Sequence, residues 1–205
     1  MWPTSRETLE LLEEIRRGDA RAADELLGRH RESVRRMINL RLDPAIVQRV
    51  DASDVVQDVL LEASRRLQDF LSKPTMPFHL WLRHIAKDHI IDAHRKHHLA
   101  KKRGVDREQA LVRPAWADQS SLDLASRLLD QELTPASAAM QQELQRRLRA
   151  ALLDLPEDDR EVILMRHFEQ MANQEVAAAL NLTEAAASMR YLRALRRLRE
   201  ILSDE

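Results

Sequence analysis

The 205-residue sequence contains no cysteine, only three glycines and 3% aromatic residues. The absence of cysteine excludes disulfides, thiolate metal ligands and cysteine nucleophiles. β-Sheets favour aromatic and β-branched residues and need glycine-rich turns, which are scarce here. Leu, Ala, Arg and Glu dominate instead, so the composition predicts an all-α protein.

The sequence also lacks a long apolar run. No stretch approaches the length of a transmembrane helix, and Trp2 and Pro3 open the chain without the basic and apolar parts of a signal peptide. We therefore expect a cytoplasmic protein that does not insert into membranes. Its length and its 44% hydrophobic content suffice for one or two small domains with their own cores.

The net charge of −1 does not by itself indicate nucleic-acid binding, but the charges are unevenly distributed. Residues 1–103 contain 20 Lys and Arg against 16 Asp and Glu, whereas residues 104–143 contain 3 against 7. Five arginines crowd into the last expected helix, namely Arg190, Arg193, Arg196, Arg197 and Arg199. The basic segments are therefore local, and an acidic segment separates two helical blocks.

The first block, residues 9–103, carries apolar residues at helical spacing. Asp19 and Asp51 are suited to cap two of its helices, and Pro44 is suited to end one. The last helix of the block is expected to follow a proline-containing loop and to begin near Phe78. On the helix after Asp51, three acidic residues recur every four positions and share an exposed face, namely Asp54, Asp58 and Glu62.

Residues 104–134 are predicted to form a flexible acidic linker, because they contain Gly104, Pro114 and several serines. One short helix could form within it from four leucines, Leu122, Leu124, Leu128 and Leu129. The second block, residues 135–203, begins after Thr134, where an N-cap residue is followed by proline at the first helical position. The predicted fold is therefore two small helical domains joined by a linker.

Residues 174–190 have the pattern of a helix-turn-helix. A short helix ends at Asn181, which tolerates the left-handed conformation, and Thr183 caps a longer second helix. Ala177 is small where the two helices must approach closely. The second helix would present three polar residues toward a major groove and its phosphates, namely Ser188, Arg190 and Arg193. The alternative is an ordinary helical hairpin with an arginine-rich, solvated face.

Motifs in both blocks stand in the order of one protein family. The second block contains Leu155-Pro156, Arg160-Glu161-Val162, Glu175-Val176-Ala177, Leu180 and Arg193-Ala194-Leu195-Arg196-Arg197-Leu198. The first block contains Asp51-Ala52-Ser53-Asp54-Val55-Val56-Gln57-Asp58-Val59, and Trp81-Leu82-Arg83-His84-Ile85-Ala86-Lys87-Asp88 followed by Asp92 and Arg95-Lys96. In combination the chain resembles the extracytoplasmic-function (ECF) class of sigma-70-type bacterial sigma factors. The resemblance covers most of the chain outside the linker and the extreme ends.

The resemblance implies a sigma factor that binds core RNA polymerase, recognises the −10 and −35 promoter elements and helps to open the duplex. It implies no enzymatic activity, no cofactor and no metal. The implied partners are the clamp of the largest polymerase subunit, the flap of the second subunit, and promoter DNA in duplex and single-stranded form. An anti-sigma factor is a further possible partner.

The resemblance also assigns roles to segments and residues. Residues 9–103 would be sigma region 2, and residues 135–203 would be sigma region 4. The residues implied to bind polymerase are Asp51, Asp54, Gln57, Asp58 and Glu62. Those implied to bind the −10 element and melt it are Phe78, Trp81, Lys87, Asp88, Asp92, Arg95 and Lys96. Those implied to bind the −35 element are Thr183, Ser188, Met189, Arg190 and Arg193.

Simpler interpretations exist for several of these residues. Bases that have left the duplex can stack on aromatic side chains and contact cationic ones, which would be the role of this segment in melting. Trp81 is nevertheless better explained as a core residue beside Ile85, whereas Phe78, in the loop, is expected to be the exposed aromatic. The face formed by Asp54 and Asp58 would dock on basic clamp helices according to the resemblance, but it could also be plain solvated surface.

The chain departs from the family pattern at several positions. Asp88 stands where asparagine is usual, close to the expected pocket for a flipped −10 base, and should repel phosphate. Asn181 replaces a common glycine, which is a mild change. Residues 185–187 are alanines in place of Gly-Thr-Val, and Ser188 replaces a frequent basic residue. Fewer direct base contacts are therefore expected at the −35 element, leaving phosphate and shape readout.

Six of the histidines lie between residues 79 and 98, and His94 with His97 or His98 has the spacing of helical metal ligands. No cysteine or carboxylate set completes such a site, so partial protonation near a phosphate backbone is the preferred interpretation.

Two other function classes compete with the sigma factor. A stand-alone helix-turn-helix regulator, binding an operator as a dimer, leaves the motifs of the first block unexplained. A metal-dependent enzyme would need an HExxH motif, a phosphate loop or a nucleophile–base pair, and the sequence has none.

Overall fold

The computed structural model describes residues 2–3, 5–42, 51–101, 119–128 and 138–203, with only the backbone at residues 5, 97–101 and 119. Every regular element in these ranges is a helix, which confirms the all-α fold class. The helices fall into two compact units, residues 2–113 and 114–205. No helix within the described ranges is long and apolar enough to cross a membrane.

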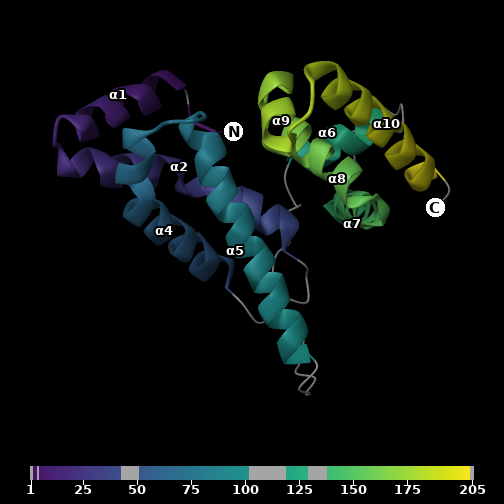
Figure 1. The fold of residues 1–205 in the computed structure, drawn as a ribbon. Helices are drawn as coiled ribbons and strands as arrows, with labels where there is room; N and C mark the ends of the chain where they lie inside the picture. Colours follow the sequence, from purple (N-terminus) through teal and green to yellow (C-terminus); the bar gives the residue numbers. More distant parts are fainter. Residues whose placement is uncertain (1, 4, 43–50, 102–118, 129–137, 204–205) are drawn as a thin grey trace. The chain divides into compact units, whose positions relative to one another are not determined.

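The first unit contains four described helices, α1 (Ser5–Arg16), α2 (Ala20–Arg41), α4 (Ala52–Ser72) and α5 (Phe78–Lys101). Helices α2, α4 and α5 pack against one another in pairs, and α1 packs against α2 (Figure 1). The amphipathic spacing that predicted these helices is explained by this arrangement, because each helix buries one apolar face.

Two of the helix starts in the first unit are capped as predicted. The Asp19 carboxylate accepts a hydrogen bond from the backbone N–H of Arg21 at 2.9 Å, and Asp51 accepts one from Ser53 at 2.8 Å. Gly18, at the turn before α2, has a φ of 95°, which a residue with a side chain rarely adopts. The proline expected to end α2, Pro44, lies outside the described residues.

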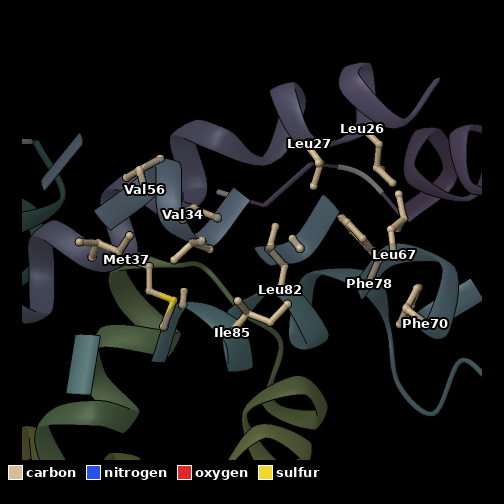
Figure 2. Close-up of a cluster of buried hydrophobic side chains, with 14 of the residues drawn as sticks. Leu26, Leu27, Val34, Met37, Val56, Leu67, Phe70, Phe78, Leu82 and Ile85 are labelled. Carbon is tan, nitrogen blue, oxygen red and sulfur yellow. The ribbon is translucent and has the colours of Figure 1, made fainter. Parts of the chain in front are cut away.

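The core of the first unit is a continuous apolar cluster between α1, α2, α4 and α5. Leu26, Val34, Met37 and Ile38 of α2 are fully buried, and so are Val59 and Ala63 of α4. Figure 2 shows Leu67, Phe70 and Phe78 lying together in this cluster. The cluster therefore includes the first residue of α5 as well as its middle.

The second unit contains α6 (Gln119–Leu128), α7 (Ala138–Asp154), α8 (Glu157–Ile163), the π-helical turn η1 (Leu164–Phe168), α9 (Asn173–Leu180) and α10 (Glu184–Ser203). Helix α10 packs against α7, α8 and α9. Its buried residues are alanines and leucines, namely Ala187, Ala194, Leu198 and Leu202. The opposite face of α10, with Ala185, Ser188, Met189 and Leu192, is exposed.

Helix α6 lies within the range expected to be linker. The short leucine-based helix predicted there is confirmed, and it packs against α7, η1 and α10. Its buried residues include Leu122, Leu124, Ala125 and Leu128. His167 of η1 also donates a hydrogen bond from Nε2 to the backbone oxygen of Ser120, over 2.7 Å. The flexible linker therefore does not extend over α6, whose apolar face belongs to the second unit; the rest of the expected linker, with Gly104, Pro114, Leu129 and Thr134, lies outside the described residues.

The π-helical turn η1 was not predicted from the sequence. The N–H of Glu169 bonds to the oxygen of Leu164, five residues earlier, at 2.9 Å, and Gln170 then has a φ of 57°. Just before and within this turn, four successive residues, Val162 to Met165, are at most 1% exposed. This segment is therefore buried on more than one side. An amphipathic pattern, which marks helices with one buried face, could not predict the π-helical turn.

Candidate nucleic-acid interface

Helices α9 and α10 form the helix-turn-helix that the sequence predicts. Asn181 ends α9 in the left-handed conformation, with φ 54° and ψ 47°, and the N–H of Leu182 bonds to the oxygen of Ala177 at 2.8 Å. Val176 and Ala177 are buried under the turn. The small side chain at residue 177 therefore has the packing role that was expected for it.

Polar contacts fix where α10 begins. Thr183 Oγ1 accepts a hydrogen bond from the N–H of Ala186 at 3.1 Å, as a capping residue does. The side-chain amide of Asn173, at the start of α9, donates to the backbone oxygen of Glu184 at 2.9 Å. The beginnings of the two helices are thus tied together, which holds the first turns of α10 in one orientation.

Acidic residues of α8 hold three of the α10 arginines. Arg190 lies 3.2 Å from Asp158, while Arg193 and Arg197 lie 3.3 and 3.1 Å from the two carboxylate oxygens of Asp159. The side chain of Asp159 is only 5% exposed. Arg193 is nevertheless exposed as expected, with 64% of its side chain accessible, whereas Arg190 is 25% accessible, so the expectation of an outward side chain is corrected for Arg190 alone. This contact could not be predicted, since its partners are far apart along the chain.

The outward face of α10 is less polar than expected. Ala185, Ser188 and Arg196 are exposed, and the large apolar side chains of Met189 and Leu192 are 66% and 48% exposed. Met189 was among the residues expected at the −35 element, whereas Leu192 was missed. Its position three residues after Met189 places it on the same face, which is the signal that could have found it.

In the first unit, α4 presents the residues expected to bind polymerase. Its outer side has Asp54, Gln57 and Asp58 exposed, while Glu62 is half-buried with an oxygen 3.9 Å from Arg66. Asp51, also exposed, is used as the helix cap. One apolar residue, Leu61, lies on this face with 48% exposure, and sequence reasoning missed it.

The expectation that Phe78 is exposed in a loop is wrong. Phe78 is the first residue of α5 and is 3% exposed. Its ring lies edge-on to Phe70 with 5.6 Å between centroids, and edge-on to His30 at 5.0 Å. The reason is that Phe78 packs against Phe70 of α4 and His30 of α2, and a loop signal before the residue does not reveal such contacts.

The other residues expected at the −10 element lie along α5. Lys87, Asp88, Arg95 and Lys96 are exposed, and half-buried Asp92 pairs with Arg95 at 3.0 Å. This is the exposed, mostly cationic side that the sequence predicts.

Trp81 is half-buried, with its ring centroid 4.8 Å from that of Phe70. Packing against the core is thus confirmed as one of its roles, while part of the ring stays accessible. It is the aromatic residue of this segment that a base could still reach.

Two histidines have structural roles that the sequence did not reveal. His94 Nε2 donates to the backbone oxygen of Arg41 at 3.2 Å, and His30 is buried with Nε2 3.2 Å from the hydroxyl of Thr8. Burial, with a smaller contribution from neighbouring His79, lowers the pKa of His30 to about 4. The side chains of His97 and His98 lie outside the described residues.

The second unit thus bears a helix-turn-helix, a motif of DNA-binding proteins, and the first exposes an acidic face on α4. Residues 26–99 match the family description Sigma-70 region 2, and residues 145–198 match Sigma-70, region 4. The chain is 26% identical over 184 residues to the ECF RNA polymerase sigma-E factor of Haemophilus influenzae, covering 90% of this chain and 89% of that protein.

Solved structures show the same fold. CnrH, in complex with the cytosolic domain of CnrY, is 23% identical with a TM-score of 0.60, covering 98% of this chain and 97% of that chain. The sigma factor RpoE of Bartonella quintana, in complex with the anti-sigma factor NepR, is 20% identical with a TM-score of 0.57, covering 88% of this chain and 96% of that chain.

The chain belongs to the ECF class of the sigma-70 family. It is a sigma factor, which binds core RNA polymerase and directs promoter-specific initiation of transcription. The prediction made from its ordered motifs is confirmed, and a stand-alone regulator is not favoured.

Proposed function

We propose that the two units divide promoter recognition, with residues 9–103 serving the −10 element and residues 135–203 the −35 element. Residues 104–134 would connect them, with α6 docked on the second unit. The observation that carries this proposal is the fixed helix-turn-helix, in which α10 turns one long face away from its own core. We further propose that the protein works in the cytoplasm, where polymerase is, and performs no chemical step itself.

For polymerase binding, the proposal rests on the exposed face of α4. Asp54, Gln57 and Asp58 lie on the same face as the exposed Leu61, on the turns that precede it. The two carboxylates suit the basic clamp helices of the largest subunit, and the neighbouring apolar residue adds buried area on docking. Asp51 and Glu62 lie at the ends of this surface and already have partners within α4.

The test is charge reversal on this face. The double variant Asp54→Lys and Asp58→Lys should weaken binding to core polymerase at least about tenfold, because both charges would then repel a basic surface. The matched control is Glu14→Lys with Asp24→Lys, which makes the same change of charge at exposed positions of α1 and α2. Equal affinity of the two double variants would overturn the α4 assignment.

For melting, the proposal rests on the exposed cations of α5. Lys87, Arg95 and Lys96 can contact the phosphates of the opened strand, and the accessible part of Trp81 can stack on a base. Asp88, exposed among these cations, would limit where a phosphate can sit, and Asp92 orients Arg95 through their ion pair.

For the −35 element, the proposal places the start of α10 in the major groove. Thr183 and the helix N-terminus favour a nearby phosphate, with Ser188, Met189, Arg190 and Arg193 on the following turns. Promoter-directed transcription by core enzyme and this protein tests the assignment. If Arg190→Ala and Arg193→Ala together change neither promoter strength nor sequence preference, these two arginines do not contact the −35 element.

Two further contacts belong to the proposal. The flap of the second polymerase subunit would hold the second unit near the upstream element. An anti-sigma factor would compete with polymerase, as the Bartonella relative solved with one suggests. Co-purification with core enzyme, with and without such an inhibitor, would test both contacts.

A further inference from the structure

One stripe of α10 is apolar although it faces away from the core. Ala185, Met189 and Leu192 follow each other at intervals of four and three residues, so they share a helix face. All three are exposed, Met189 at 66%. The core-facing stripe of the same helix is separate and consists of Ala187, Ala194, Leu198 and Leu202. The outward stripe is therefore not needed to fold the second unit.

Three of the cationic side chains beside this stripe are paired with carboxylates of α8, although Arg193 and Arg197 stay 64% and 49% exposed. Asp159 of α8 holds Arg193 at 3.3 Å and Arg197 at 3.1 Å, while Asp158 lies 3.2 Å from Arg190. Because Asp159 is 5% exposed, moving either of its partners away would leave a buried carboxylate with less compensation. Pairing with Asp159 occupies one nitrogen of Arg193 and one of Arg197, which leaves each guanidinium fewer N–H groups for a guanine edge than an unpaired arginine has.

The surroundings of the stripe favour DNA over a protein surface as its partner. Five arginines and only two glutamates lie on α10, and the stripe runs from the capped N-terminus toward exposed Arg196. A positive helix terminus at one end and cations along the sides suit a groove lined by phosphates. In the major groove, the apolar group presented by the base pairs is the C5 methyl of thymine.

We propose that α10 recognises thymine methyl groups in the upstream promoter element through Ala185, Met189 and Leu192. This inference rests on the proposed function, in which α10 enters the major groove. It replaces the expectation of phosphate and shape readout alone with direct recognition that uses apolar contact. Ser188, exposed on the flank of the stripe, adds a hydrogen bond to a neighbouring base edge.

The test first selects upstream elements from a randomised promoter library with the complete holoenzyme, and then replaces each thymine singly by uracil. Uracil pairs with adenine as thymine does and lacks only the methyl group. For the wild-type protein, at least one replacement should reduce transcription about three- to fourfold, as expected for losing one buried methyl contact.

Variants then assign the contact to the stripe. For Met189→Ala, the ratio of transcription from the thymine template to that from the uracil template should fall close to one at one position and stay unchanged at the others. Leu192→Ala should have the same effect at a neighbouring position. Leu153→Ala is the matched control, since Leu153 of α7 is an exposed apolar residue of the same unit at 48% exposure. This control should retain the full ratio.

Several outcomes would overturn the inference. Ratios near one at every thymine in the wild type would mean that methyl groups are not sensed. A guanine preference that Arg193→Ala abolishes would make arginine the base contact. A loss of transcription in Met189→Ala that is equal on thymine and uracil templates would mean that the stripe binds a protein. By contrast, failure to obtain promoter-dependent transcripts with core enzyme would refute the proposed function itself.

Discussion

Asp159 of α8 accepts a hydrogen bond from Arg197 of α10, with 3.1 Å between Oδ2 and Nη1. The other oxygen of the same carboxylate accepts one from Arg193, at 3.3 Å. Since Arg193 and Arg197 are one helical turn apart, a single buried side chain holds one turn of α10 against α8. This contact joins the framework of the second unit to the helix that we place on DNA.

Replacing Asp159 should therefore destabilise the second unit. Asp159→Asn keeps the volume but loses the charge that two arginines share, and should lower the free energy of unfolding by about 1–3 kcal/mol. Asp158→Asn is the control, because Asp158 is 76% exposed and its pair with Arg190 should contribute less than about 0.5 kcal/mol. Urea unfolding followed by circular dichroism compares the variants, and hydrogen exchange should locate the loss in α8 and α10. Equal effects of the two changes would contradict this role for Asp159.

The buried His30 predicts a dependence of stability on pH. Its pKa in the folded protein is lowered from 6.5 to about 4, so the unfolded chain binds a proton more readily than the folded one. The stabilisation from neutral His30 is complete above about pH 6.5 and is lost as the pH falls toward 4, by up to about 3 kcal/mol.

His30→Gln should flatten the dependence of unfolding free energy on pH in this range. His84→Gln is a useful control, because partial burial and then neighbouring Arg83 lower the pKa of His84 in the same direction, while most of that residue stays accessible to solvent. Denaturant unfolding at pH 4.5, 5.5 and 7 measures the slope. An unchanged slope in His30→Gln would show that other groups cause the acid sensitivity.

Phe78 and Lys87, both on α5, should separate stability from promoter melting. Phe78→Ala should cost about 3–5 kcal/mol of stability because it empties a core position, whereas Phe78→Leu should be tolerated and should open promoters normally. Lys87→Ala should leave stability unchanged within about 0.5 kcal/mol and slow the opening of the duplex. Permanganate footprinting measures opening. Slow opening in a stable Phe78→Leu protein would instead indicate that the ring contacts a base.

The position of α6 leads to a prediction for limited proteolysis. Because the apolar face of α6 is buried against α7 and η1, the resistant C-terminal fragment should begin before Gln119 rather than near residue 135. Leu124→Asp should expose α6 and move the start of the fragment to a point after Leu128. Mass spectrometry of the fragments measures where each one begins. Rapid cleavage inside α6 in the unchanged protein would show that the helix does not stay docked.

The sequence predicted the elements better than the contacts between them. Asp19, Asp51 and Asn181 act locally, on backbone groups a few residues away, and all three have the roles that their chemistry indicates. Phe78 was misjudged because its burial depends on α4, which a loop signal before the residue does not reveal.

In the candidate interface, too, local features could be predicted and contacts between helices could not. The face of α4 and the start of α10 could be predicted, because helical spacing alone decides which residues share a face. The hydrogen bonds between Asp159 and α10 could not be predicted, because Arg193 and Arg197 lie 34 and 38 residues away in the sequence and meet Asp159 only in the packed unit. Leu61 and Leu192 were missed because single exposed leucines are common on protein surfaces. They become informative only when the structure shows which other surface residues lie beside them.

The pairing of α10 arginines with α8 carboxylates also affects how binding should respond to ionic strength. A cation that is already neutralised within the protein displaces fewer counterions from DNA than one that arrives unpaired. Three of the five arginines of α10 are paired in this way. Engagement of the upstream element should thus persist at salt concentrations that weaken purely phosphate-based contacts, and its temperature dependence should carry the negative heat-capacity change of apolar burial.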